Sequence, residues 1–177
     1  MKFRNINILT VLAVSAAIAF TACSKDDGAI PKRIKIEDVP AMTMNLEPQK
    51  KDNIDTIRFG NQAAFAGKFK VAMVFPDQVK PTKVDIVVRK NGAAASVKVY
   101  KADITSFPTS FTFSAAEIVA LFGAPVALND TYDFAPDIYV GTKKYEAFPI
   151  TGLGSGAGVT GMNSIGYYEY VRITVKN

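Results

Sequence analysis

The side chains available for chemistry in this chain are carboxylates, lysines and tyrosines. The 177 residues include no histidine and no tryptophan, and the single cysteine is Cys23. Without histidine there is no Ser-His-Asp or Cys-His arrangement and no histidine-ligated zinc. We therefore expect a protein that is not an enzyme and that needs no cofactor, with a hydrolase as the third hypothesis only.

Three acids fall close together in the second half of the chain, at Asp130, Asp133 and Asp137. Calcium prefers such oxygen ligands, and a pair of carboxylates can also hydrolyse a glycosidic bond. The three acids lack EF-hand spacing, however, and Asn129-Asp130 is an ordinary turn pair. We therefore predict neither a metal site nor a catalytic pair at these positions.

Glycine recurs between residues 152 and 166, as it does in phosphate-binding loops. A P-loop ends in a Lys-Ser/Thr pair and opens a helix, whereas this stretch leads into a strand pattern. The sequence therefore predicts a long loop between the last two strands. It leaves open whether that loop contacts a ligand or a partner.

Two tyrosines near the C-terminus are the candidate ligand-binding residues. Val171, Ile173 and Val175 alternate with polar residues in the terminal segment. A strand that buries these three side chains turns Tyr168 and Tyr170 outward, with their rings about 7 Å apart at a rise of ~3.3 Å per residue. That spacing suits neighbouring units of a sugar chain or one extended protein contact, and tyrosine serves both.

Residues 1–22 have the pattern of a removable signal peptide. Lys2 and Arg4 precede an apolar run over residues 6–20. The run is too short and too interrupted for a membrane-spanning helix, which needs about 20 apolar residues. Phe20-Thr21-Ala22-Cys23 resembles a lipobox, the motif cleaved before a lipid-modified cysteine, with Phe20 in place of the usual Leu. We expect acyl chains on Cys23 to anchor the protein in a membrane; the alternative is ordinary cleavage that leaves a free thiol.

The residues after Cys23 carry a second signal. Lys25, Asp26 and Asp27 resemble the export signal of Bacteroidetes surface lipoproteins, which is an address and not an anchor. This resemblance implies an outer-membrane protein that faces the cell exterior. The alternative is that residues 23–40 are a solvated tether without an address.

Residues 41–177 are long enough to form one domain with its own core. Loss of Lys2 and Arg4 with the signal peptide lowers the formal net charge from +5 to +3. This charge is small and evenly spread, so we expect no nucleic-acid partner.

Short segments of alternating polarity recur from residue 41 onward, which predicts strands. Asn91-Gly92 predicts a hairpin with a type I′ turn. The expected strands cover residues 42–47, 54–59, 68–75, 83–90, 94–101, 131–140, 144–150 and 167–176. Within these strands, Phe75 and Val99 are expected on the buried face.

One helix is expected among the strands. Ser114 and Glu117 form a capping box at its start, and Gly123 followed by Pro125 ends it. Seven or eight short strands with one such helix indicate an all-β protein, an antiparallel immunoglobulin-like β-sandwich with one short crossover helix.

The order of these segments resembles a known family. The run from residue 107 to the capped helix, the turn at 129–132, the segment 144–149 and the terminal strand resemble the immunoglobulin-like domains of Bacteroidetes surface lipoproteins. Some of these accompany starch-utilisation-type outer-membrane transporters. The resemblance covers roughly residues 65–177 and implies a fold and a cellular setting, but it carries over no ligand-binding residue.

The sequence therefore favours a surface lipoprotein that binds glycan or supports a glycan-uptake complex. The alternative is a structural or adhesive module whose partner is another protein. Aromatic faces surrounded by polar side chains would favour sugar. A flat tyrosine surface with an apolar centre would favour a protein partner.

Overall fold

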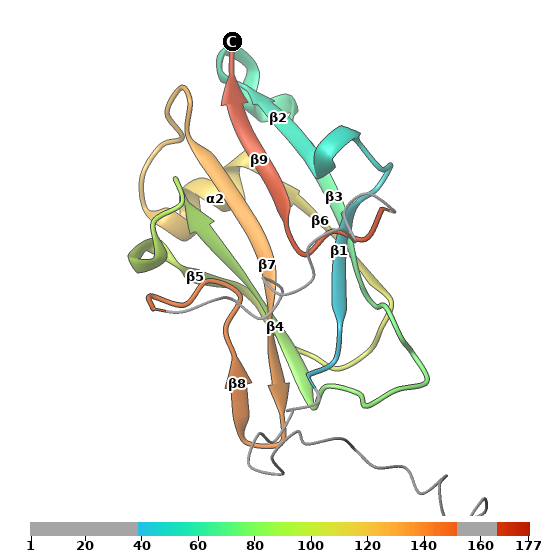
Figure 1. Ribbon diagram of the computed structural model, residues 1–177. Coiled ribbons are helices and arrows are strands. Elements are labelled where there is room, and N and C mark those ends of the chain that lie inside the picture. The colour runs from blue at the N-terminus through green and yellow to red at the C-terminus, as the bar shows by residue number, and fades with distance from the viewer. Residues whose placement is uncertain (1–38, 152–165) are drawn as a thin grey trace, which may run out of the picture. The chain divides into compact units, whose positions relative to one another are not determined.

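A computed structural model of the chain describes residues 39–151 and 166–177, which form two β-sheets (Figure 1). The three-stranded sheet has the order β1 (Met42–Leu46), β3 (Ala66–Met73) and β6 (Thr109–Ser114). The six-stranded sheet has the order β2 (Ile54–Arg58), β9 (Val171–Lys176), β7 (Thr131–Val140), β4 (Lys83–Lys90) and β5 (Lys98–Ile104), and β8 (Lys143–Tyr145) pairs with β7. All neighbours are antiparallel except β2 and β9, which run parallel. The expected all-β class is confirmed.

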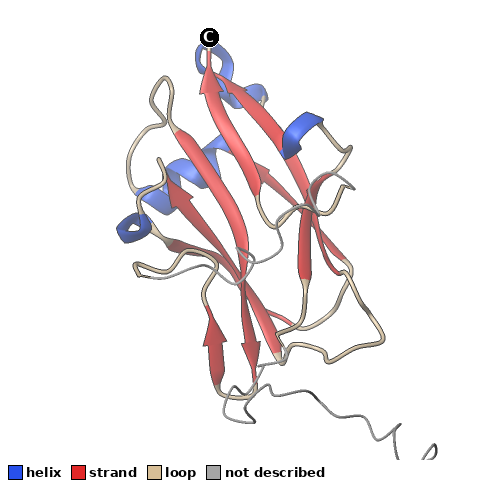
Figure 2. Cartoon of the chain, viewed as in Figure 1, coloured by secondary structure: helices blue, strands red, loops and turns tan. Residues whose placement is uncertain are grey.

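Helices occupy only connections between strands (Figure 2). The α-helix α2 (Ala115–Phe122) carries the chain from β6 in one sheet to β7 in the other. Three 3-10 turns complete the described helices: η1 (Lys51–Asn53), η2 (Phe59–Ala64) and η3 (Ala94–Ser96).

Alternation of apolar and polar residues places the core between the two sheets. Val171, Ile173 and Val175 of β9 are fully buried, as their spacing predicts. Phe113 of β6 and Phe134 of β7 come from different sheets, and their ring centroids lie 4.8 Å apart. Aromatic pairs at this distance add to the energy of area burial, so these rings join the sheets.

The capped helix is confirmed in its details. The Ser114 hydroxyl accepts a hydrogen bond from the Glu117 backbone N–H, and the Glu117 carboxylate accepts one from the Ser114 backbone N–H. Gly123 ends the helix with a φ of 68°, in the left-handed region that favours glycine. Because the helix has only eight residues, its packing through buried Ile118 is needed to hold it.

The hairpin between β4 and β5 is also confirmed. Asn91 and Gly92 have φ values of 51° and 71°, and the Ala93 N–H donates to the Lys90 carbonyl over 3.0 Å. Positive φ at both central residues is the requirement of a type I′ turn. The 3-10 turn η3 follows, so β5 begins at Lys98 and not at residue 94.

Two expected core residues are exposed. Val99 is 52% exposed because it pairs with Val87, which lies on the side of β4 opposite to the core residues Ile86 and Val88. Tyr100 packs against the core in its place. Phe75 is 56% exposed because β3 ends at Met73 and the chain has already entered a loop.

Strand boundaries also differ from expectation. The strand β6 was not predicted, although Phe111 and Phe113 alternate with Ser110 and Thr112 in it. The expected strand 144–150 shortens to Lys143–Tyr145, and the expected strand 167–176 begins only at Val171.

Candidate functional site

Three charged side chains lie in a row across the side of the six-stranded sheet that faces away from the core. Arg89 of β4 pairs in register with Asp133 of β7, and Asp133 pairs in register with Arg172 of β9. Each side chain lies opposite in parity to the core-cluster residues of its own strand, which directs all three to the outer side. Val87 of β4 and Ala135 of β7 pair on that same side and are also buried. We call this row the arginine ladder.

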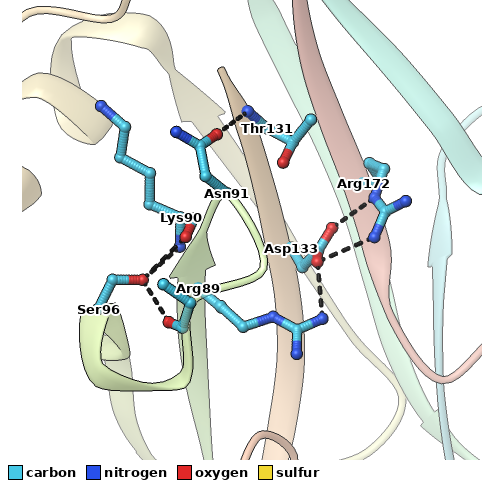
Figure 3. Close-up of polar contacts among 8 residues, drawn as sticks. Arg89, Lys90, Asn91, Ser96, Thr131, Asp133 and Arg172 are labelled. Atoms are coloured by element: carbon cyan, nitrogen blue, oxygen red, sulfur yellow. Dashed lines mark hydrogen bonds and ion pairs between the residues drawn. The ribbon is translucent and has the colours of Figure 1, made fainter. Parts of the chain in front are cut away.

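The Asp133 carboxylate lies between the two guanidinium groups (Figure 3). Its Oδ2 accepts from Nη2 of Arg89 over 2.9 Å. Arg172 donates from Nε to Oδ1 over 2.6 Å and from Nη2 to Oδ2 over 3.0 Å. The Asp133 residue itself is fully buried. Because one buried carboxylate accepts hydrogen bonds from both guanidinium groups, Asp133 positions both arginines.

Aromatic rings extend the ladder at both ends. The guanidinium carbon of Arg89 lies 4.1 Å from the ring centroid of Phe148, and that of Arg172 lies 5.3 Å from the ring centroid of Tyr170. Both distances are within cation–π range. All of these side chains except Asp133 are partly accessible, so the row presents aromatic faces beside charged and polar groups.

The charge of the site is positive, because two guanidinium groups meet one carboxylate in the ladder. The hydrogen bond to Asp133 raises the pKa of the Arg172 guanidinium above its ordinary value, although burial opposes the shift. Glu169, which precedes Tyr170 in the chain, is half-buried, and burial raises the pKa of its carboxyl.

Tyr168 and Tyr170 lie outside the last strand. Both precede β9 and are half-buried, so the expected strand position is wrong and the spacing of about 7 Å does not apply. Their backbone is instead bound to β1 and η1. The Tyr168 carbonyl accepts from the Met44 N–H over 2.7 Å, and the Asn45 Oδ1 accepts from the Tyr168 N–H over 3.2 Å. Of the two rings, that of Tyr170 joins the ladder.

Asn53 connects this segment to the first strand. Its side chain accepts from the Leu46 N–H over 2.8 Å and donates to the carbonyls of Met44 and Tyr170 over 2.8 and 2.7 Å. The residue is 1% exposed. The Asn53 side chain therefore provides hydrogen-bond partners for three backbone groups that are not paired by a neighbouring strand. It also holds Tyr170 next to β9.

The other two aspartates of the expected trio bind different partners. Asp137 pairs with the Lys144 ammonium over 2.8 Å and accepts from the Ala147 N–H over 2.8 Å. Asp130 pairs with Lys90 over 2.7 Å. Among the described residues, no group of three or more acidic, histidine or cysteine side chains converges as metal ligands would.

Asp130 organises the turn before β7. It accepts from the Asn91 amide, the Ala127 N–H and the Tyr132 hydroxyl, in addition to Lys90. Burial alone would raise the pKa of this carboxyl, but the hydrogen bonds outweigh burial and lower the pKa to about 2.

Several predicted residues lie outside the described part of the chain. They are Cys23, Lys25, Asp26, Asp27, the signal peptide and the glycine-rich residues 152–165. Within residues 39–151 and 166–177, no helix is both long and apolar enough to span a membrane. No protein-family model matches the sequence, and the comparisons with curated proteins and with solved structures find no match.

The residues that sequence reasoning missed are Arg89, Arg172 and Phe148. Each strand pattern marks Arg89 and Arg172 as outward-facing. Neither pattern reveals that their strands flank β7, because cross-strand neighbours depend on strand order.

Proposed function

We propose that this chain is a lipid-anchored lipoprotein of the outer-membrane surface, whose immunoglobulin-like domain binds glycan without catalysis or serves a glycan-uptake system. The anchor and the address rest on the motifs at Cys23 and at Lys25, Asp26 and Asp27. The observation that carries the binding function is the row of Phe148, the arginine ladder and Tyr170 on the outer side of the six-stranded sheet.

The strand order supports an immunoglobulin-like fold. In that fold the last strand, G, pairs with F, and F pairs with C and then C′. The order β9-β7-β4-β5 follows the same sequence, and β1-β3-β6 follows A-B-E. Near the start of β7, the Tyr132 hydroxyl donates to Asp130 over 3.0 Å, a position close to that of the tyrosine corner. The chain departs from antibody domains in lacking both the core tryptophan and the disulfide.

The composition of the row supports sugar over a protein partner. Sugars bind where an aromatic face is combined with convergent polar groups. Tyr170 and Phe148 each have a guanidinium group against their ring, so each aromatic ring of the row lies beside a charged hydrogen-bond donor. Asp133 has both carboxylate oxygens bound to arginine, so it supports binding and not acid–base chemistry.

The test uses the mature chain with Cys23→Ser, which removes the lipid anchor. A glycan array is screened with this protein and with the added change Tyr170→Ala, alone and together with Tyr168→Ala. We expect binding to fall at least fivefold, or about 1 kcal/mol, while the melting temperature changes little. Tyr167→Ala is the matched control, because Tyr167 is 40% exposed in the same segment.

Two results would contradict the proposal. One is an array on which the parent protein binds no glycan. The other is equal binding by the Tyr170→Ala and Tyr167→Ala proteins. Capture of an outer-membrane protein by the parent, lost in Tyr170→Ala while the array stays empty, would instead support the structural or adhesive alternative.

A further inference from the structure

An apolar pocket of about 420 Å³ lies where the described chain begins. Its lining residues come from the first described residues and from the loop between β3 and β4: Val39, Pro40, Ala41, Phe75, Gln78 and Val79. Phe75 is 56% exposed and Val79 is 48% exposed. Single exposed apolar residues are ordinary, but these two large ones border the same pocket.

The loop that carries Phe75 and Val79 is attached at both of its ends. The Val74 N–H donates to the Ala41 carbonyl over 2.9 Å, and the Thr82 N–H donates to the Tyr139 carbonyl over 2.7 Å. These bonds hold residues 74–82 between the start of β1 and the end of β7. The two apolar side chains are therefore presented outward by a loop that is fixed at its base.

The loop has no net charge to attract a partner. Asp77 and Lys80 are its only charged residues, and both are exposed. Contact made by this loop must therefore depend on apolar burial, which salt does not weaken.

The length of the chain between Cys23 and the pocket limits which surface the pocket can reach. Sixteen residues, 23–38, separate the lipid-modified position from Val39, which is part of the pocket wall. Fully extended, they span at most about 55 Å. An anchor at Cys23 would keep the pocket at an effective concentration on the order of millimolar relative to the bilayer. At that concentration even a weak apolar contact is populated.

We propose that this end of the domain rests on the lipid surface, with Phe75 and Val79 in the headgroup region. The inference rests on the lipid anchor of the proposed function and adds an orientation to it. Instead of swinging freely on its tether, the domain is seated by a second contact. The end of β7 near Tyr139 then faces the membrane, and the start of β7 lies about 30 Å farther away, given ten residues at ~3.3 Å each.

The chain's lack of a second cysteine makes a direct test possible. The lipidated protein is prepared with Gln78→Cys in the pocket or Leu128→Cys before β7, and the new thiol is labelled with an environment-sensitive fluorophore. Leu128 is the matched control because it is 41% exposed at the opposite end of β7. Vesicles of phosphatidylethanolamine and phosphatidylglycerol in equal parts contain a lipid-borne quencher.

We expect quenching at position 78 to exceed that at position 128 at least twofold, in low and in high salt. The added changes Phe75→Ser and Val79→Ser should lower quenching at position 78 to the level at position 128. Equal quenching at both positions in protein that floats with the vesicles would overturn the orientation alone.

Two further outcomes would also overturn the inference. Protein that does not float with the vesicles would refute the lipid anchor, and the orientation with it. A disulfide-linked dimer of unlabelled Gln78→Cys, without quenching of the labelled form, would assign the pocket to a second copy of the chain.

Discussion

Asn53 offers the sharpest test of how the two sheets are joined. Its side chain makes three hydrogen bonds to the backbone, one to Leu46, one to Met44 and one to Tyr170. Its φ of 56° lies in the left-handed region, which asparagine tolerates and most other residues do not. Replacement by glycine removes the side chain and keeps this φ accessible.

The expected loss follows from the bonds. Each hydrogen bond contributes about 1 kcal/mol net, and the buried Leu46 N–H is left without its acceptor. We expect Asn53→Gly to lower the free energy of unfolding by about 3 kcal/mol. Asn53→Ala should lose about 1 kcal/mol more, because alanine resists a positive φ. These are large fractions of the 5–15 kcal/mol that is typical of a domain.

The assay is urea unfolding of the mature chain with Cys23→Ser, followed by circular dichroism. At a slope of about 2 kcal/mol per molar urea, Asn53→Gly should lower the midpoint by about 1.5 M. Asn61→Gly is the control, because Asn61 is an exposed asparagine in η2. If the midpoints of the Asn53→Gly and Asn61→Gly proteins agree, the buried amide does not join the sheets, and the reasoning fails.

Three further changes test other parts of the fold. Gly67→Ala should cost about 1–3 kcal/mol, because its Cβ would lie 2.4 Å from two ring carbons of buried Phe113; an unchanged melting temperature would contradict this. Ser114→Ala and Gly123→Val should each cost about 1 kcal/mol through the lost cap and the strained φ, measured by thermal unfolding. Asp130 ionises with a pKa of about 2 in the folded state and near 4 when unfolded, so it stabilises the fold above about pH 4 and loses this effect as the pH falls to 2. Asp130→Asn should therefore be about 2 kcal/mol less stable at pH 7 and should approach the parent near pH 2; parallel pH profiles would refute that.

Much of the fold could be predicted because it depends on neighbours in the sequence. A period of two identified the buried face of β9, and two residues that tolerate positive φ identified the turn at Asn91-Gly92. The capping box at Ser114 could be predicted in the same way, because its partners are three residues apart.

The errors arose where distant groups decide the local structure. Val99 faces solvent because β5 pairs with β4 in a register that places Val99 opposite Val87, and no local pattern reveals that register. The alternation before Val171 predicted a longer strand. In the fold, the side chains of Asn45 and Asn53 bind the backbone of residues 166, 168 and 170, and β9 begins after them.

The candidate site also combines features that the local sequence determines with features that depend on distant contacts. By itself, the sequence determined which side chains exist for chemistry and, within the strands that formed as expected, that Arg89 and Arg172 face away from the core, because side-chain direction along a strand follows from its period of two. Tertiary structure alone decided which of those side chains meet. Arg89 and Arg172 lie 44 and 39 residues from Asp133, and they reach it only because β4 and β9 flank β7. Strand order is set by how the sheets close around a shared core, a property of the whole chain that no local pattern encodes.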